Sequence, residues 1–265
     1  MTTAARGPAM PTITPLMHGV GPNSPDGVIA FSSILLIEGE HRIVFDSAHV
    51  GRRTLLWQRL EDRGLAPTDV DFNVVSHAHW DHVQNIDVFD HAPLLLHRDE
   101  IRYAHKPHRN DWATPQWTGA ILDTIPGLTE VGEGHEVMPG VKVVELPGHS
   151  PGSIGLEVET DEGIALLVGD AIHNARVAQA GRSPLVFWNE QQANASIKRV
   201  VDSGALIYPG HDLPFRIKDG EVTYFGETDV TVSGPAGVRW VDPPADPPPI
   251  ETWVMPGIEE QSLEA

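Results

Sequence analysis

The residues best suited to chemistry are His77, His79, Asp81 and His82, four potential metal ligands within six positions. They follow residues 71–75, whose apolar composition is typical of a buried strand that ends at the edge of a sheet. Alternate side chains of an extended chain point the same way, so the first two histidines would face one ion. The turn that follows would bring the other two ligands to a second position. This spacing predicts a metal site rather than a structural turn.

More ligand candidates share one context, a predicted strand followed by a turn of small residues: His149 after residues 141–146, Asp170 after residues 164–168 and His211 after residues 205–208. A glycine directly precedes each of them. Glycine allows a sharp turn and a close approach of the backbone, as the end of a strand beside a crowded site requires.

The composition restricts the class of partner. Hydrophobic residues make up 40% and charged residues 21% of the 265-residue chain, as in ordinary globular proteins with a sizeable core. The 18 Lys and Arg against 37 Asp and Glu give a net charge of −19, which repels nucleic acids and anionic lipid surfaces. The chain has no cysteine, so His and carboxylate groups must hold any metal. We therefore expect a small-molecule substrate and neither nucleic acid nor membrane as a partner; a homodimer is compatible with the sequence.

Three regions are expected along the chain. Residues 1–28 predict an N-terminal lead-in, loose or at a sheet edge, residues 29–230 a single catalytic domain, and residues 231–265 a proline-rich acidic tail. The proline run predicts either an extended strap or disorder. The first 20 residues lack the apolar core of a secretory signal, and no later run reaches about 18 apolar residues, which together predict a cytoplasmic enzyme.

Residues 100–130 mix basic and aromatic groups without a clear period, which predicts a covering loop with helical pieces, after a short helix from Arg98. Two interpretations stay open for the cations of residues 98–117, which are Arg98, Arg102, Lys106 and Arg109. They form a solvated helix face, or they form a cationic lid that attracts a carboxylate or phosphate group. Four aromatic residues are expected to line an apolar pocket beside them or to be packed: Trp112, Trp117, Phe187 and Trp188.

Taken in order, the His-Ala-His-Trp-Asp-His segment, His149, Asp170 and His211 resemble the ligands of the metallo-β-lactamase superfamily of hydrolases, over roughly residues 30–215. The resemblance implies an α/β protein, an αββα sandwich with a two-metal cleft along one edge of the sheets. It implies that the first ion is held by His77, His79 and His149, the second by Asp81, His82 and His211, with Asp170 bridging them. Asp46 matches an acidic residue near the site and is expected to orient a ligand histidine.

Two divalent ions about 3.5–4 Å apart lower the pKa of a shared water enough to supply a bridging hydroxide at neutral pH. The expected reaction is hydrolysis, with no Ser or Cys nucleophile. Asp81 has a lone pair that could take the proton and pass it to the leaving group. Zinc suits the His and Asp donors, and iron, manganese and cobalt accept the same set.

The resemblance also narrows the subclass. True β-lactamases of the superfamily carry Cys or Ser at the position of Asp170, thioesterases of the glyoxalase II type add a helical domain after the last ligand, and the tRNA-processing nucleases need a basic arm. Lactonases acting on N-acyl homoserine lactones remain. They place a Tyr three residues after the bridging Asp, where this chain has His173, which can also donate a hydrogen bond to a developing oxyanion.

The sequence therefore predicts a dinuclear metal-dependent hydrolase that opens an ester, lactone or related acyl bond in a small molecule, with Asp81 and His173 as catalytic residues. Phosphodiesterase or thioesterase activity on the same site is one alternative. An iron-dependent redox function is another, because the superfamily includes such members.

Overall fold

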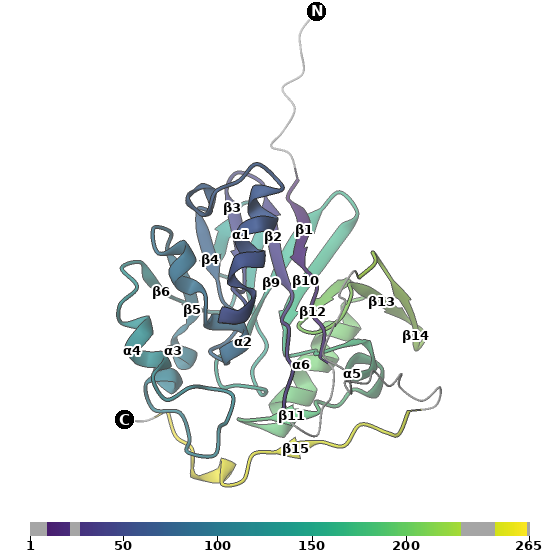
Figure 1. Ribbon diagram of the computed structural model, residues 1–265. Coiled ribbons are helices and arrows are strands. Elements are labelled where there is room, and N and C mark those ends of the chain that lie inside the picture. The colour runs from purple at the N-terminus through teal and green to yellow at the C-terminus, as the bar shows by residue number, and fades with distance from the viewer. Residues whose placement is uncertain (1–9, 22–26, 229–246, 264–265) are drawn as a thin grey trace, which may run out of the picture.

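The computed structural model describes residues 10–21, 27–228 and 247–263. Two β-sheets pack face to face, and helices cover the outer side of each (Figure 1). This is the predicted αββα sandwich.

The first sheet has the strand order β1-β2-β3-β4-β5-β6. The strands are β1 (Thr12–Met17), β2 (Ile34–Glu38), β3 (Arg42–Phe45), β4 (Phe72–Val74), β5 (Leu94–His97) and β6 (Leu128–Val131). The pairs β1–β2 and β2–β3 are antiparallel. The pairs β3–β4, β4–β5 and β5–β6 are parallel. Strand β1 lies at the sheet edge within the region expected as a lead-in. Strand β6 begins inside the loop expected at residues 100–130, so that prediction is wrong for its last residues, which pair with β5.

The second sheet has the order β14-β13-β12-β10-β9-β8-β7. Its strands are β7 (Glu136–Met138), β8 (Val141–Glu145), β9 (Ile154–Thr160), β10 (Gly163–Gly169), β12 (Leu206–Pro209), β13 (Phe215–Lys218) and β14 (Glu221–Tyr224). Strands β10 and β12 pair in parallel, so their carboxyl ends reach the same edge of the sheet.

Strand β2 shows why an uninterrupted apolar run forms the centre of the first sheet. Leu35 and Ile37 pack into the cluster between the two sheets, whereas Ile34 and Leu36 pack outward against Leu56. Successive side chains of a strand point to opposite faces, so a strand buried on both faces has no polar alternation.

The helices are α1 (Arg53–Glu61), α2 (Trp80–Val83), α3 (Arg98–His105), α4 (Thr118–Leu122), α5 (Ala175–Ala180) and α6 (Glu190–Asp202). Helix α1 covers the first sheet through Leu56 and Leu60, and α6 covers the second through Ile197 and Val200. None of the helices in the described ranges is long and apolar enough to cross a lipid bilayer.

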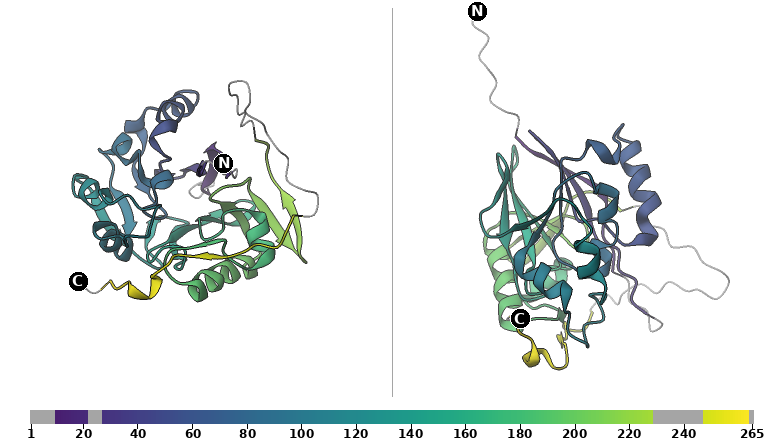
Figure 2. Two further views of the ribbon diagram at one scale, coloured as in Figure 1. Left: turned by 60° about the horizontal axis from the view of Figure 1, so that its bottom comes forward. Right: turned by 90° about the vertical axis from the view of Figure 1, so that its left-hand side faces the viewer.

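The C-terminal residues 247–263, which we call the strap, run across the base of the molecule and are extended up to a 3₁₀ helix at Ile258–Glu260, as the yellow ribbon in Figures 1 and 2 shows. Within the strap, β15 (Trp253–Val254) pairs in parallel with β11 (Leu185–Val186). Of the two alternatives for the tail, the extended strap is therefore the one seen for these residues. Positions 231–246 of the expected tail lie outside the described residues, and the three-region division of the chain stays a prediction.

Candidate metal centre

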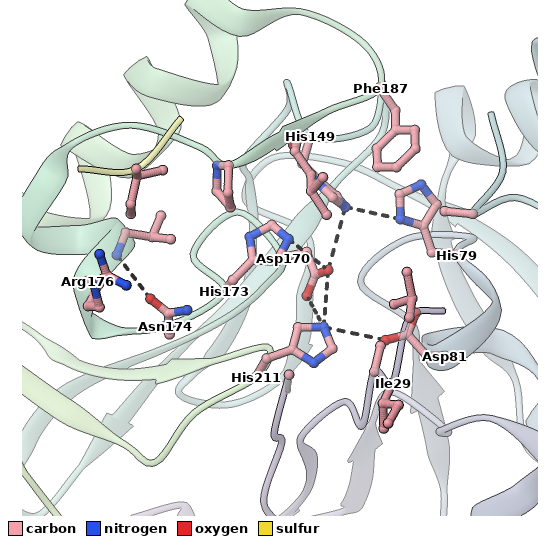
Figure 3. Close-up of a pocket in the computed structure, with 18 of the residues that line it drawn as sticks. Ile29, His79, Asp81, His149, Asp170, His173, Asn174, Arg176, Phe187 and His211 are labelled. Atoms are coloured by element: carbon pink, nitrogen blue, oxygen red, sulfur yellow. Dashed lines mark hydrogen bonds and ion pairs between the residues drawn. The ribbon is translucent and has the colours of Figure 1, made fainter. Parts of the chain in front are cut away.

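All the predicted ligands converge at one edge of the sandwich. His77 and His79 lie in the loop after β4, and Asp81 and His82 are in the first turn of α2. The others follow strands: His149 after β8, Asp170 after β10 and His211 after β12. Five of them point toward one shared space in Figure 3: His79, Asp81, His149, Asp170 and His211.

Two of the glycines beside the ligands are required by the geometry. Gly148 has φ of +128°, and a Cβ there would collide with the backbone of Ala193. A Cβ on Gly210 would collide with the carboxylate of Asp170. Any side chain at either position would push a ligand out of place, which is why the sequence has glycine here.

The first group of ligand atoms comes from His77, His79, His149 and Asp170, and these atoms lie within 4.8 Å of one another. Nδ1 of His79 is 3.0 Å from Nε2 of His149, and the latter is 3.6 Å from Oδ2 of Asp170. Two nitrogens bound to one tetrahedral zinc ion lie about 3.3 Å apart, given metal–nitrogen bonds of about 2.0–2.1 Å. The spacing is that of ligands around a small ion.

Asp81, His82 and His211 form the second group, which lies beside the same Asp170 carboxylate. Oδ1 of Asp170 is 3.2 Å from Nε2 of His82 and 3.1 Å from Nε2 of His211, and its Oδ2 is 3.3 Å from that His211 nitrogen. Oδ2 of Asp81 is 3.4 Å from the same nitrogen. The Asp170 carboxylate thus lies between the two groups.

In two of the ligand histidines, a hydrogen bond made by one ring nitrogen determines which nitrogen is available to a metal ion. Nδ1 of His149 lies 2.9 Å from the carbonyl of Leu185, and Nδ1 of His211 lies 3.0 Å from the carbonyl of Phe31. A carbonyl only accepts, so each Nδ1 carries a proton and donates it, and each Nε2 is the ring nitrogen directed into the site. The residues fit a metal in this respect.

Buried polar atoms without hydrogen-bond partners also support a metal site. Among the described residues, Nε2 of His77, Nε2 of His82 and Oδ1 of Asp170 are buried and have no hydrogen-bond partner. Burial, with neighbouring histidines adding to it, lowers the pKa of His77 and His79 well below the ordinary value. Neutral imidazoles with free lone pairs are the form that binds a metal ion.

Asp46 orients His82, as expected from the sequence. Its Oδ2 accepts a hydrogen bond from Nδ1 of His82 at 2.8 Å, and its Oδ1 accepts one from the backbone N–H of Ser76 at 2.7 Å. Burial alone would lower the pKa of His82, but Asp81, Asp170 and Asp46 outweigh it and raise that pKa well above the ordinary value. Three buried carboxylates around one imidazole make the site strongly attractive to cations.

The sequence model of the Metallo-beta-lactamase superfamily matches residues 26–211, the range that contains both ligand groups. The chain belongs to the metallo-β-lactamase superfamily. With this ligand set, it is a metal-dependent hydrolase.

Relatives of this metallo-β-lactamase superfamily member include Metallo-beta-lactamase domain-containing protein 1 of Xenopus laevis, 32% identical over 197 residues, which are 73% of this chain and 76% of the relative. The N-acyl homoserine lactonase of Bacillus cereus is 30% identical over 155 residues, 57% of this chain and 59% of the lactonase. The match thus spans less than two thirds of the lactonase.

Two solved structures show the same fold. An N-acyl homoserine lactone hydrolase with N-hexanoyl-L-homoserine bound at its catalytic metal center aligns with a TM-score of 0.62 at 22% identity, over 78% of this chain and 94% of that one. A probable metal-dependent hydrolase from Staphylococcus aureus aligns with a TM-score of 0.69 at 16% identity, over 86% of this chain and 100% of that one.

His173, which stands where lactonases of the superfamily carry Tyr, lies at the candidate centre. Its Nε2 is 3.4 Å from Oδ2 of Asp170, and its ring stacks on that of His211 at 5.8 Å between centroids. Burial lowers the pKa of His173 to about 3, against the raising effect of Asp170. The imidazole is therefore neutral at pH 7, with one N–H to donate.

A cavity of about 410 Å³ opens onto the candidate centre. Trp112 and Phe187 are among its lining residues, whereas Trp117 and Trp188 are not. The cations of the expected lid are also elsewhere: Arg102, Lys106 and Arg109 line a separate cavity with strap residues 260–263. Arg102 pairs with Asp99, and Arg109 pairs with Glu260. The solvated helix face fits Arg98 and Arg102, whereas Lys106 and Arg109 lie after the end of α3.

One residue of the site was not anticipated from the sequence. Glu100 of α3 is fully buried, and its carboxylate accepts hydrogen bonds from the Ala78 N–H at 2.9 Å, the Ser150 hydroxyl at 2.8 Å and the Gly152 N–H at 2.8 Å. It thereby ties the loop of His77 and His79 to the turn of His149. The available signal was an acidic residue on the face of α3 that also carries Ile101 and Ala104.

Proposed function

We propose that this protein hydrolyses an ester, lactone or related acyl bond in a small molecule, in the cavity beside the candidate metal centre. We infer two divalent ions, with zinc the first choice. The first would be held by His77, His79 and His149, the second by Asp81, His82 and His211. The observation that carries the proposal is the position of the Asp170 carboxylate between the two groups, 3.6 Å from Nε2 of His149 on one side and 3.1 Å from Nε2 of His211 on the other.

Bound there, the ions would make a water ionisable at neutral pH and polarise a carbonyl oxygen. The protein's own side chains have separate tasks. Asp81 is buried, and burial raises its pKa above the ordinary value, so its free lone pair can hold the proton released by the attacking water and deliver it to the leaving oxygen. His173 would donate its N–H to the carbonyl oxygen as negative charge develops on it.

The walls of the cavity support an acyl substrate of small size. Phe187 stacks edge-on against His79 at 4.6 Å between centroids, and Trp112 packs on Phe187 at 5.2 Å. These rings exclude water from one side of the ligands, which strengthens the electrostatic interactions there. Relatives named N-acyl homoserine lactonases also support an acyl bond in a small molecule. The net charge of −19 argues against nucleic acid, and a cytoplasmic location remains our proposal.

The test is a panel of esters, lactones, thioesters and phosphodiesters assayed with protein loaded separately with zinc, manganese, iron or cobalt. We expect turnover of ester or lactone substrates, lost in His77→Asn and Asp170→Asn. His135→Asn is the matched control, because His135 is exposed and belongs to neither ligand group. Absence of ester and lactone hydrolysis with every metal would refute the proposal. Turnover of phosphodiesters or thioesters alone would support the first alternative, and iron found exclusively after anaerobic purification would support the redox one.

A further inference from the structure

The strap brings residues from outside the family-matched range to the substrate cavity. The family match ends at residue 211, whereas the strap comprises residues 247–263. Pro248, Pro249, Ile250 and Glu251 all line the cavity that contains the candidate metal ligands. The superfamily ligand set and this part of the wall therefore come from different parts of the chain.

Several contacts hold the strap against the elements that form the cavity. Besides the β11–β15 pairing, they are the hydrogen bonds from Arg176 Nη2 to the Pro248 carbonyl (2.7 Å), from Thr252 Oγ1 to the Ser183 carbonyl (2.9 Å), from Asn110 Nδ2 to the Pro256 carbonyl (2.7 Å) and from Gln261 Nε2 to the Phe187 carbonyl (2.8 Å). Met255, fully buried, packs with Phe187 and Ala113. The strap is thus docked along its length. Arg176, which holds Pro248, is three positions after His173 in the sequence.

The segment is suited to be a rigid apolar wall. Proline has a fixed φ and loses little conformational freedom on ordering, so Pro248 and Pro249 present their rings at small entropic cost. Ile250 is partly buried and packs on the cluster of α5 and α6 while it lines the cavity. Val28, Ile29 and Leu185 add apolar surface to the same cavity. Among its lining residues in the described ranges, Arg176 is the only Lys or Arg, and it is already engaged with Pro248.

We propose that Pro248, Pro249 and Ile250 form a specificity-determining wall that receives the apolar part of the acyl substrate. The inference rests on the proposed function and deepens it: the substrate class is an acyl compound with an apolar group of several carbons. Each methylene buried against such a wall strengthens binding about fourfold, so the wall selects substrates by chain length.

The experiment compares Ile250→Ser and Ile250→Phe with the wild type, all zinc-loaded and with thermal unfolding recorded to establish that each is folded. Val254→Ser is the matched control, since Val254 is in the strap but does not line the cavity. One readout is kcat/KM for alkyl esters and lactones with acyl chains of increasing length. The other is the Kd of straight-chain alkanoates from calorimetry, which needs no turnover.

In the wild type we expect Kd to fall about fourfold per methylene over part of the series. Ile250→Ser should flatten this dependence, with at least about tenfold loss for the longest chain that binds and less than about twofold for acetate. Ile250→Phe should shorten the longest chain accepted, and Val254→Ser should match the wild type. A uniform loss along the series in both Ile250 variants, or no dependence on chain length in the wild type, would overturn the inference. Chain-length selectivity in binding without hydrolysis of any substrate would support the wall and refute the proposed function instead.

Discussion

Replacing Glu100 by Gln removes one charge and one acceptor from a buried junction between two ligand-bearing turns. In the wild type Oε1 accepts from the Ala78 N–H, and Oε2 accepts from the Ser150 hydroxyl and the Gly152 N–H. A Gln side chain can keep its oxygen at only one of these positions. Its amide N–H group then faces a donor at the other, so that at least one buried N–H loses its partner.

We expect this to cost about 3 kcal/mol of folding stability at pH 7, the upper end of the about 1–3 kcal/mol that an unsatisfied buried donor costs. For a chain of this size the melting temperature should fall by roughly 6–12 °C. Ala78 lies between His77 and His79, so displacement of its backbone should also weaken metal binding, by about tenfold.

The pH dependence of folding stability tests the electrostatic contribution of Glu100. Burial raises the pKa of Glu100 from 4.5 to about 7 against the lowering effect of its three hydrogen-bond donors. A raised carboxyl pKa contributes stability that is complete below the unfolded value and is lost as the pH rises through the folded value. The advantage of the metal-free wild type over Glu100→Gln should therefore be larger at pH 5 than at pH 7, by about 2 kcal/mol.

The assays are denaturant unfolding of the metal-free proteins from pH 5 to pH 8 and competition with a chromophoric chelator for zinc affinity. Glu130→Gln on β6 is the control, because Glu130 is an exposed carboxylate. Lower stability with unchanged zinc affinity would show that Glu100 does not position the ligands. An advantage that grows as the pH rises would show that the donors outweigh burial.

Other changes probe the centre directly. Asp46→Asn should weaken metal binding about 10- to 100-fold in chelator competition, because the amide no longer offers a charged acceptor to His82 Nδ1; unchanged affinity would contradict this role. His173→Phe should lower kcat about 100-fold with KM within about threefold, and His173→Gln, which retains an N–H, should recover part of the loss; equal kcat in the Phe variant would remove His173 from the mechanism. Removal of metal by a chelator at pH 7 should abolish hydrolysis and lower the melting temperature, and added zinc should restore both; hydrolysis that survives in demonstrably metal-free protein would refute metal dependence.

The predicted ligands could be read from the sequence because their information is local. Four of them share one short segment, and the others each follow an apolar strand and a glycine, so strand pairing within each sheet and the packing of the two sheets bring the turns to one edge. The role of Glu100 is not local, since its partners lie 22, 50 and 52 positions away. The cations of residues 98–117 left two interpretations open for a related reason: helical spacing is visible in the sequence, but Arg109, which lies after the end of α3, pairs with Glu260 at a separation of 151 positions.

The strap was the hardest part to anticipate, because several of its anchors are backbone carbonyls and a two-residue strand pairing, which leave no side-chain pattern. The residues that anchor the strap are also separate from those that hold the metal ligands. The ligand turns are held by Asp46, Glu100 and glycines inside the family-matched range, and none of these touches residues 248–251 through a recorded hydrogen bond among the described residues. Substitutions in the strap wall can therefore change which acyl group is accepted while the spacing of the metal ligands stays the same. Substitutions at Asp46 or Glu100 should instead weaken the centre for every substrate alike.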